Sequence, residues 1–487
     1  MTQARTSQLP VAVIGGGPVG LAAASNLALR QEPFILLEAG LSPAHSMEQW
    51  RHVRLFSPWR YCIDAAARQL LADTSWEEPN LEGLPTAGDL IDDYLTPLAA
   101  HPAIASHIRF GARVTAVARA GIDKARSAGR GDAPFELRLA DGSTLQARAV
   151  IDASGTWTAP NPLGVNGLAV AGEEATAQHV SYGIPDVLDK ERARFAGRRV
   201  MVVGSGHSAI NGVLDLLQLR EQSPETAVLW AMRRTPGSHL YGGETNDALP
   251  ARGALGSRAR AAIESGSVAM LAPFSAQRLE LLEDGVRVTG TLGGAAQTVD
   301  VDEIVVATGF RPDLDMLREL RLSIDPALEA TASLAPLIDP NVHSCGTVPP
   351  HGYRELAHAE PGFFVVGMKS YGRAPTFLMA TGYEQVRSVV AHLAGDEVAA
   401  SRVELVLPET GVCGAPTEDA SSCCDTSASS LSPEGDLIPV VAAASCCGGP
   451  APTDSSSCCA LDESAKASGE AGCGCKTAQP LVATANA

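Results

Sequence analysis

The hydrophobic pattern near the amino end of the chain predicts a strand, a glycine-rich turn, a helix and a second strand in immediate succession. Four β-compatible apolar residues, Val11–Ile14, run into a turn with three spaced glycines. An Ala- and Leu-rich segment with helical spacing follows, and a second apolar strand covers 34–37. That strand ends at an acid, Glu38. This order is typical of a βαβ unit in a parallel α/β sheet.

The spacing of the glycines adds a chemical prediction to this pattern. The missing side chain allows a tight turn at Gly15, lets the backbone approach a pyrophosphate at Gly17 and permits close helix packing at Gly20. The amino end of the helix then points at the phosphates. Glu38 is placed to accept hydrogen bonds from ribose hydroxyls, so the segment predicts a dinucleotide site. A glycine-rich loop in another kind of α/β protein is the alternative.

Aromatic residues and cations gather behind this first unit, between 39 and 84, where the apolar periodicity is weaker. Trp50, Arg51 and Trp59 are expected either to shelter a ring system or, for the two tryptophans, to pack in a core. Residues 85–100 then predict a helix with one apolar side.

A further group of strands is expected before residue 152. The pattern predicts a short strand at 114–118 and a hairpin that turns at Asp141–Gly142. An apolar strand ending at Ile151 follows. We expect these strands to complete a mixed sheet with the first unit.

The strand, turn, helix and strand occur a second time from residue 198. Gly204, Gly206 and Ala209 take the three special positions of the turn, and alanine is tolerated at the last because it only limits helix–strand packing. The second strand of this unit ends at Arg233 and Arg234, where the first unit has an acid. Cations here suit a 2′-phosphate, which indicates NADPH rather than NADH. Two solvated arginines after an edge strand are the alternative.

Two similar segments mark where the chain passes between these units. Ile151–Gly155 and 304–309 each combine the end of an apolar strand with small residues and a glycine. The repetition predicts that the second unit is inserted in the first and that the two crossings form a hinge. The expected ranges are 8–158 and 305–407 for the first domain, 159–304 for the inserted domain and 408–487 for a tail.

The composition fits a globular protein with large cores, since 45% of the 487 residues are hydrophobic and 19% are charged. The formal net charge of −18 argues against nucleic acid as a partner, because phosphate contacts need a Lys/Arg surface. Apolar runs are broken before the roughly 18 residues that a membrane span needs. We therefore expect a cytoplasmic protein without a membrane partner.

Cysteine is distributed unevenly along the chain. Cys62 and Cys345 stand alone, whereas nine cysteines lie between Cys413 and Cys475 in a Ser-, Ala- and Gly-rich tail whose composition predicts disorder. Close thiol pairs can meet on one soft ion, whereas a disulfide between neighbouring residues strains the peptide. The tail therefore predicts a site for As(III), Hg(II), Cu(I) or Zn(II) at Cys423, Cys424, Cys446, Cys447, Cys458, Cys459, Cys473 and Cys475. A low-complexity tail without a selected ligand is the alternative.

The segment after the second crossing carries the candidates for catalysis. Cys345 is expected to be either a redox-active or substrate-binding thiol or a buried structural cysteine. His351 and Arg373 are further catalytic candidates. A helix from about residue 376 is expected to direct its amino end at negative charge on a reduced ring system, although an ordinary core helix would show the same pattern.

The motifs GGGPVG, DASGTW, GSGHSA and ATGFRP occur in this order along the chain. Over residues 8–405 they resemble the superfamily of flavin-dependent monooxygenases and pyridine-nucleotide-disulfide reductases. FSPWRY, HVSYGIPDVL and VGMKSYGRAPTF are similar to the flavin-binding monooxygenases encoded in bacterial arsenic-resistance clusters. The resemblance implies an α/β protein with two Rossmann-like domains, which bind FAD and NADPH. It places the cofactor contacts at Gly15, Gly17, Pro18, Gly20, Glu38, Ala39, Trp50, Val117, Ser154, Gly155, Gly204, Ser205, Gly206, His207, Ser208, Ala209, Arg233, Arg234, Gly309, Gly367 and Met368.

Two departures from these families keep the reaction open. The monooxygenase fingerprint F-x-G-x-x-x-H-x-x-x-W/F/Y is not intact, because Gly172 and His179 are too far apart. The dithiol motifs of thioredoxin reductase and lipoamide-type enzymes are also missing, since no C-x-x-C lies in the inserted domain and no C-x-x-x-x-C follows the first unit.

Three hypotheses follow. The first is an FAD- and NADPH-dependent oxidoreductase of monooxygenase type in metalloid detoxification, acting on a small molecule such as a trivalent arsenical and forming a homodimer. The second is a flavoprotein reductase of a disulfide or metal–thiolate that uses the cysteine tail as carrier. The third is a metalloid-binding or sensing protein with the flavin domain as redox partner.

Overall fold

The computed structural model describes residues 9–405 except 238, 239, 243, 245, 246, 248, 343–347 and 376. All of them belong to one unit of the chain, Met1–Glu418. Cys345 and the predicted cysteine tail lie outside the described residues. Within the described part, no helix combines the length and hydropathy that a membrane span requires.

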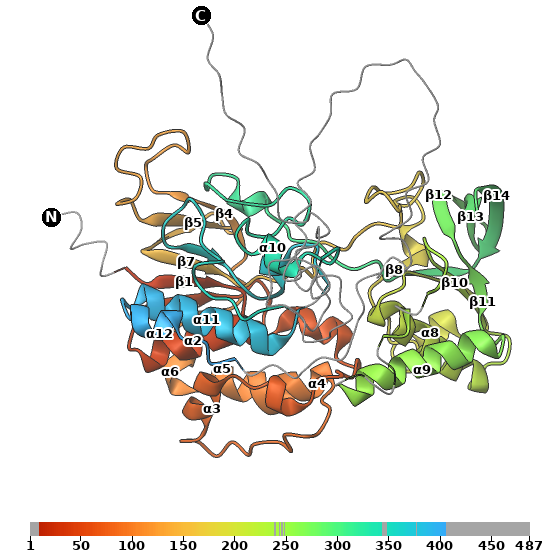
Figure 1. Cartoon of the computed structure of the whole chain (residues 1–487), viewed down its shortest axis with the longest axis horizontal. Coiled ribbons are helices and arrows are strands. Elements are labelled where there is room, and N and C mark those ends of the chain that lie inside the picture. Colours follow the sequence, from red (N-terminus) through yellow and green to blue (C-terminus); the bar gives the residue numbers. More distant parts are fainter. Residues whose placement is uncertain are drawn as a thin grey trace, which may run out of the picture. The chain divides into compact units, whose positions relative to one another are not determined.

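A five-stranded parallel sheet forms the centre of the first half of the fold (Figure 1). Its order is β16-β7-β1-β2-β3, with bounds Phe363–Val365, Ala149–Asp152, Val11–Ile14, Phe34–Leu37 and Ile108–Arg109. β1 pairs with both β2 and β7 and is buried along its whole length. Continuous apolar strands of this kind are typical of a parallel sheet that is covered on both faces.

Helices cover one face of this sheet. α2 (Pro18–Leu29) and α11 (Met379–Leu393) pack against each other and share a core with Val11, Val13 and Leu36. Shorter helices extend this layer: η1 (His45–Trp50), η2 (Trp59–Tyr61), α3 (Ala65–Leu71), α4 (Ala87–Leu90), the π-helical η3 (Ile91–Leu95), α5 (Thr96–Ala100), α6 (Pro102–Ala105), α10 (Ala335–Ile338) and α12 (Glu397–Ser401). The helix predicted at 85–100 is confirmed, with one π-helical turn inside it.

A separate three-stranded antiparallel sheet covers the other face. Its strands are β4 (Val114–Arg119), β5 (Phe135–Leu139) and β6 (Thr144–Ala147), and the short η7 (Asp315–Leu317) packs on β4. Val117 and Phe135 are buried in the same core as Ala12 and Ile14. The prediction of a single mixed sheet was wrong, because β1 and β7 already have a strand on each side, so the hairpin stacks on the sheet instead of joining it.

The second half of the fold repeats these three layers. Its parallel sheet has the order β11-β10-β9-β15-β8, with bounds Ala269–Leu271, Ala227–Ala231, Arg199–Val203, Glu303–Val306 and Val180–Tyr182. Helices pack on one face: α8 (His207–Gln222) and α9 (Pro250–Glu264), with the short η4 (Ala177–His179) and α7 (Arg192–Phe195) nearby in the chain. An antiparallel sheet packs on the other face, formed by β12 (Phe274–Leu282), β13 (Gly285–Leu292) and β14 (Ala295–Val301).

The second half is inserted in the first, because its sheet is built entirely from residues between β7 and β16. The two segments that cross between the halves bind each other. The Asn161 N–H donates to Gly309 O at 2.9 Å, and the Arg311 N–H donates to Ala159 O at 3.0 Å. We call this pair of segments, 157–161 and 308–311, the crossing ribbon. β15 runs to Val306, past the boundary expected at 304, and the domain ranges themselves stay predictions.

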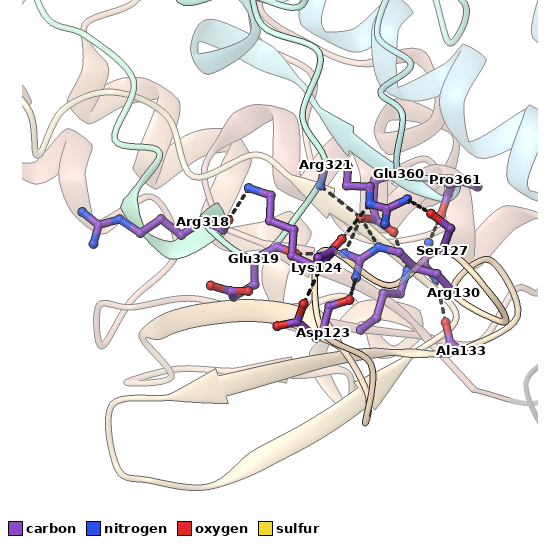
Figure 2. A network of polar contacts seen from close by, with 12 residues as sticks. Asp123, Lys124, Ser127, Arg130, Ala133, Arg318, Glu319, Arg321, Glu360 and Pro361 are labelled. Carbon is purple, nitrogen blue, oxygen red and sulfur yellow. Dashed lines mark hydrogen bonds and ion pairs between the residues drawn. The ribbon is translucent and has the colours of Figure 1, made fainter.

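A buried carboxylate holds distant segments of the first half together (Figure 2). Glu360 accepts hydrogen bonds from Arg119 Nε and from Arg130 Nη2, each at 2.7 Å. All three side chains are at most 4% exposed. Arg130 Nε and the Arg321 N–H also donate to this carboxylate, each at 3.1 Å. Burial by itself would raise the pKa of Glu360, but the hydrogen bonds from the two guanidinium groups outweigh it and lower that pKa.

Replacing Glu360 by Gln is expected to lower the free energy of unfolding by about 3 kcal/mol, because two buried guanidinium groups lose their counterion. Urea unfolding of the full chain at pH 7 measures this loss. Since the folded-state pKa of Glu360 is lowered, the wild-type contribution is complete above the ordinary value of 4.5 and is lost as the pH falls through the lowered pKa.

The control for this substitution is Glu280→Gln, which removes an exposed partner of Arg278. We expect it to change the free energy of unfolding by less than about 0.5 kcal/mol. Equal losses in the two variants would contradict the argument from burial.

Candidate functional site

The first glycine-rich loop lies where β1, α2 and the end of β7 meet. Gly15 has a φ of +100°, and a Cβ atom there would lie 2.6 Å from the carbonyl oxygen of Ala153. At Gly20 it would lie 1.9 Å from Gly15 O, whereas at Gly17 it would meet no atom within 4 Å. Pro18 then begins α2. The turn is therefore closed toward the protein and open at Gly17, which is the cradle that a pyrophosphate requires.

Glu38 lies at the edge of this loop, directly after β2. Its side chain accepts a hydrogen bond from the Gly16 N–H at 2.6 Å and another from the Gly40 N–H at 2.7 Å. Two backbone donors thus fix a carboxylate that is 8% exposed. Each carboxylate oxygen has a further acceptor position, so ribose hydroxyls can still donate to it.

The second glycine-rich loop repeats the geometry of the first. Gly204 has a φ of +134°, and a Cβ atom there would lie 2.3 Å from the carbonyl oxygen of Ala307. At Gly206 a Cβ atom would meet nothing within 4 Å. In both units a side chain on the first glycine would collide with the carbonyl oxygen of an alanine. That alanine directly follows the neighbouring strand: it is Ala153 after β7 in the first unit and Ala307 after β15 in the second. Both loops therefore fit a dinucleotide.

The edge of the second loop differs in charge from that of the first. Arg233 and Arg234 are exposed after β10, and neither forms an ion pair with a carboxylate of the described residues. Arg252 differs, because it is buried and donates two hydrogen bonds of 2.8 Å to Asp247. Two exposed guanidinium groups suit a phosphate better than a ribose hydroxyl.

His207 is the first residue of α8 and lies directly after the second glycine loop. Its ring centroid is 5.1 Å from that of Phe56, which belongs to the first half. Burial, together with the charge of Arg252, lowers the pKa of His207. A neutral imidazole therefore lies at the amino end of α8, beside an aromatic ring of the first half.

A buried ion pair lies next to the first glycine loop. Lys369 Nζ is 2.8 Å from Asp152 Oδ2 and 3.1 Å from Ser154 Oγ. The lysine and aspartate side chains are at most 1% exposed. The Ser154 hydroxyl also donates to Asp152 Oδ1 at 2.6 Å. Lys369 lies on the 3₁₀ helix η8 (Gly367–Tyr371), so the pair joins the end of β7 to the segment after β16.

Gln385 of α11 fixes the start of η8 and the position of His351. Its Oε1 accepts the Gly367 N–H at 2.7 Å, and its Nε2 donates to Ser370 Oγ at 2.9 Å. The same Nε2 is 2.9 Å from His351 Nε2, and His351 Nδ1 is 3.0 Å from the Pro349 carbonyl oxygen. His351 Nδ1 therefore carries the proton, and Nε2 accepts. Burial lowers the pKa of His351, which favours this neutral form.

The other predicted cofactor residues lie mostly at the carboxyl edges of the two parallel sheets. They directly follow β2, β7, β15 and β16 or belong to the second loop: Ala39, Ser154, Gly155, Gly309, Gly367, Met368, Ser205, Ser208 and Ala209. Trp50 lies 6.1 Å from the ring of Trp157 in the crossing ribbon. Val117 differs, because its side chain is fully buried between the two sheets of the first half and faces no loop.

The catalytic candidates are not brought together among the described residues. His351 is 4% exposed and held by Gln385, whereas Arg373 is exposed with Nη1 3.9 Å from Glu329. Cys345 and the eight predicted metal ligands of the tail lie outside the described residues. Within the described ranges, no group of three His, Cys, Asp or Glu side chains is arranged to hold a metal ion.

Cys62 is the one cysteine among the described residues, and it is fully buried. Its thiol points at the carbonyl oxygen of Ser57 at 3.6 Å. Burial raises the pKa of Cys62 to about 12. A neutral, inaccessible thiol is a structural group rather than a redox nucleophile.

Three residues of this region were missed from the sequence: Asp152, Lys369 and Gln385. Asp152 and Lys369 each carried one signal, a charge near the end of a buried apolar strand: Asp152 is the last residue of β7, and Lys369 follows the end of β16 by four positions. Their pairing spans 217 positions and is visible only in three dimensions. Gln385 carried no signal beyond a polar residue on the buried side of a helix.

Comparison with known proteins connects this geometry with one family. The family description "Pyridine nucleotide-disulphide oxidoreductase" matches residues 12–344. An indole-3-pyruvate monooxygenase, YUCCA1 of Oryza sativa subsp. japonica, is 35% identical over 221 residues, which are 44% of this chain and 46% of the relative. A ferredoxin–NADP reductase of Thermus thermophilus is 24% identical over 219 residues, 44% of this chain and 57% of the relative. The chain thus matches about half the length of these relatives.

Solved structures share the fold over most of the described residues. Bacillithiol disulfide reductase Bdr from Bacillus cereus has a TM-score of 0.58 at 19% identity, and the match covers 80% of this chain and 99% of that one. The cadaverine monooxygenase DfoA from Erwinia amylovora has a TM-score of 0.55 at 13% identity, and the match covers 83% of this chain and 98% of that one. These likenesses show two Rossmann-like domains in one chain.

Two glycine substitutions should separate folding from binding at the first loop. Gly20→Ala is expected to lower both the melting temperature and the amount of dinucleotide retained, because its Cβ would lie 1.9 Å from Gly15 O. Gly17→Ala is expected to retain little dinucleotide, but after removal of the dinucleotide from both proteins its melting temperature should lie within about 2 °C of the wild type, because the space is open. Absorbance of the purified protein and thermal unfolding measure the two effects.

The matched control is Gly131→Ala, an exposed glycine with open space that lies outside both loops. We expect wild-type binding and stability from it. Undiminished dinucleotide retention in Gly17→Ala would contradict the position assigned to the pyrophosphate.

Proposed function

The chain belongs to the pyridine nucleotide-disulphide oxidoreductase family, and from this premise we propose that it is an oxidoreductase that uses FAD and NADPH. The observation that carries the proposal is the repeated loop geometry with opposite charges at its edge. The first loop ends at the carboxylate of Glu38, and the second ends at Arg233 and Arg234. Two dinucleotide sites in one chain, one bordered by a carboxylate and the other by two guanidinium groups, indicate two different dinucleotides.

The first unit holds FAD, and the second holds NADPH. Glu38, fixed by two backbone donors, receives the ribose hydroxyls of an adenosine without a 2′-phosphate. Arg233 and Arg234 receive the 2′-phosphate that distinguishes NADPH from NADH. Gly17 and Gly206, where a Cβ atom would meet nothing within 4 Å, would be the positions at which the backbone holds the two pyrophosphates.

When bound, the two cofactors supply the redox chemistry, with hydride passing from the nicotinamide to the flavin. This chain contributes binding and orientation. Lys369 and Asp152 hold η8 against the first loop, and Gln385 fixes the Gly367 N–H at its start. The neutral imidazole of His207 adds no charge at the amino end of α8, so the attraction of that end for a phosphate comes from the backbone N–H groups of the helix itself.

For the oxidative half-reaction we favour oxygen as the electron acceptor, as in a monooxygenase. The support is that Cys62, the one described cysteine, is a buried neutral thiol, so the described residues contain no dithiol relay. Among the relatives, the indole-3-pyruvate monooxygenase has the highest identity of those reported above. A trivalent arsenical as substrate, a role in metalloid resistance and a homodimer are further parts of this proposal, supported by the motifs of the sequence.

A reductase of a disulfide or metal–thiolate is the second candidate. The nine cysteines between Cys413 and Cys475 supply thiols that the described residues lack, and a bacillithiol disulfide reductase shares the fold. In this case the bound flavin would supply its two electrons to a disulfide formed by a cysteine pair of the tail, which would be reduced to two thiols, rather than to oxygen.

The assignment of NADPH is tested by the double variant Arg233→Gln/Arg234→Gln. We expect the apparent Kd for NADPH to rise at least about tenfold, since two charge-assisted contacts to phosphate are lost, while the apparent Kd for NADH stays unchanged. Anaerobic flavin reduction with each nucleotide measures this. Arg198→Gln is the control, because Arg198 is exposed at the opposite edge of the same sheet. Equal changes for NADPH and NADH would contradict a 2′-phosphate site.

The electron acceptor is tested by reducing the yellow protein with NADPH without oxygen and then mixing it with oxygenated buffer. A monooxygenase should give a long-lived absorbing species between the reduced and oxidised spectra. The reductase should reoxidise in a single step with release of peroxide, and its substrate turnover should disappear when the tail cysteines are replaced by serine. Undiminished turnover by a chain shortened after residue 407 would contradict the second candidate.

A further inference from the structure

Two guanidinium groups converge on one glycine between the two halves of the fold. A Cβ atom built on Gly167 would lie 3.2 Å from Nη2 of Arg311 and 3.6 Å from Nη2 of Arg373. Gly167 has a φ of +81°, a conformation that side chains rarely adopt, so a larger residue there would be strained and would place its Cβ against both groups. Arg311 comes from the crossing ribbon, and Arg373 follows η8.

The charge of this pair is only partly balanced by the described residues. Arg311 Nε is 3.3 Å from Asn161 Oδ1, and its Nη2 is 3.4 Å from Gly167 O, so both partners are neutral and distant. Arg373 has one carboxylate nearby, Glu329, at 3.9 Å from its Nη1. Two cations and one anion leave a single net positive charge. Like charges this close repel each other, and a bound anion would remove the repulsion.

The backbone fixes the position of both arginines. The Arg311 N–H donates to Ala159 O at 3.0 Å inside the crossing ribbon. The Arg373 N–H donates to Leu328 O at 2.7 Å, directly after the turn at Gly372. At Gly372 a Cβ atom would lie 2.0 Å from the same Leu328 oxygen, so this turn accepts no other residue. The backbone at both arginines is therefore held by a hydrogen bond to another segment of the chain.

We infer that Arg311 and Arg373 form a binding site for the carboxylate of a small organic acid. A carboxylate is a planar monoanion that matches guanidinium donors, and one negative charge completes the balance left by Glu329. A phosphate dianion would bring two negative charges against this one net positive charge. The site lies between the crossing ribbon and the segment after η8, outside both dinucleotide loops. Such an acid is a ligand other than the trivalent arsenical proposed above as substrate, so its binding does not rest on the proposed function.

Calorimetric titration of the oxidised, flavin-loaded full chain with benzoate tests the site, with benzamide as the neutral analogue and inorganic phosphate as the competing anion. We expect saturable binding of benzoate, none of benzamide and no displacement by equimolar phosphate. Arg311→Gln and Arg373→Gln should each weaken benzoate binding at least about tenfold, because a charge-assisted contact is lost. Arg318→Gln, whose side chain is exposed beside Asp315, should bind as the wild type does.

Each contrary result overturns the proposal in its own way. Absence of benzoate binding to the wild type, or equal binding of benzamide, removes the carboxylate site. Displacement by phosphate reassigns the pair to a phosphate-bearing ligand. Unchanged binding in both arginine variants places the benzoate elsewhere. Flavin reduction by NADPH is measured on the same samples, so a failure of the proposed function appears there and leaves the binding result independent.

Discussion

The buried ion pair between Lys369 and Asp152 is the interaction on which the functional edge of the first half depends. Removing both charges from water is costly, and the cost is offset only when the geometry is kept, here at 2.8 Å with Ser154 as a further partner. The pair joins the end of β7, which contacts the first glycine loop, to η8. Through Gln385 the same constraint reaches α11. The loop, the strand end and η8 therefore form one rigid support.

Two halves with the same backbone geometry differ in the chemistry at their edges. In each half a glycine of positive φ meets the carbonyl oxygen of an alanine, Ala153 or Ala307, directly after the neighbouring strand. This close approach involves backbone atoms alone, so it does not distinguish one nucleotide from another. Specificity is added by a few side chains: a carboxylate fixed by two amides in one half and two exposed guanidinium groups in the other.

Much of this arrangement could be predicted from local sequence. Strands, loops and the helix at 85–100 follow from short-range apolar spacing, and the repetition of small residues at the two crossings indicated the insertion. The separate sheet β4–β6 could not be predicted, because the hydrophobic pattern of a strand does not state whether it joins a sheet at an edge or stacks on its face. The partners of Asp152 and Arg311 also depend on residues far along the chain. Cys345 and the tail cysteines lie outside the described residues, so their roles stay predictions.

The crossing ribbon has a consequence for how the two halves can move. A tether of two independent strands would leave the inserted half free to tilt, twist and shift. Here the strands are hydrogen-bonded to each other, and the rings of Trp157 and Phe310 stack at 4.7 Å across them. The two segments are therefore tied to each other and are expected to move together rather than independently. A rotation of this joined pair would change the distance between the two glycine loops, without either half having to change its own fold.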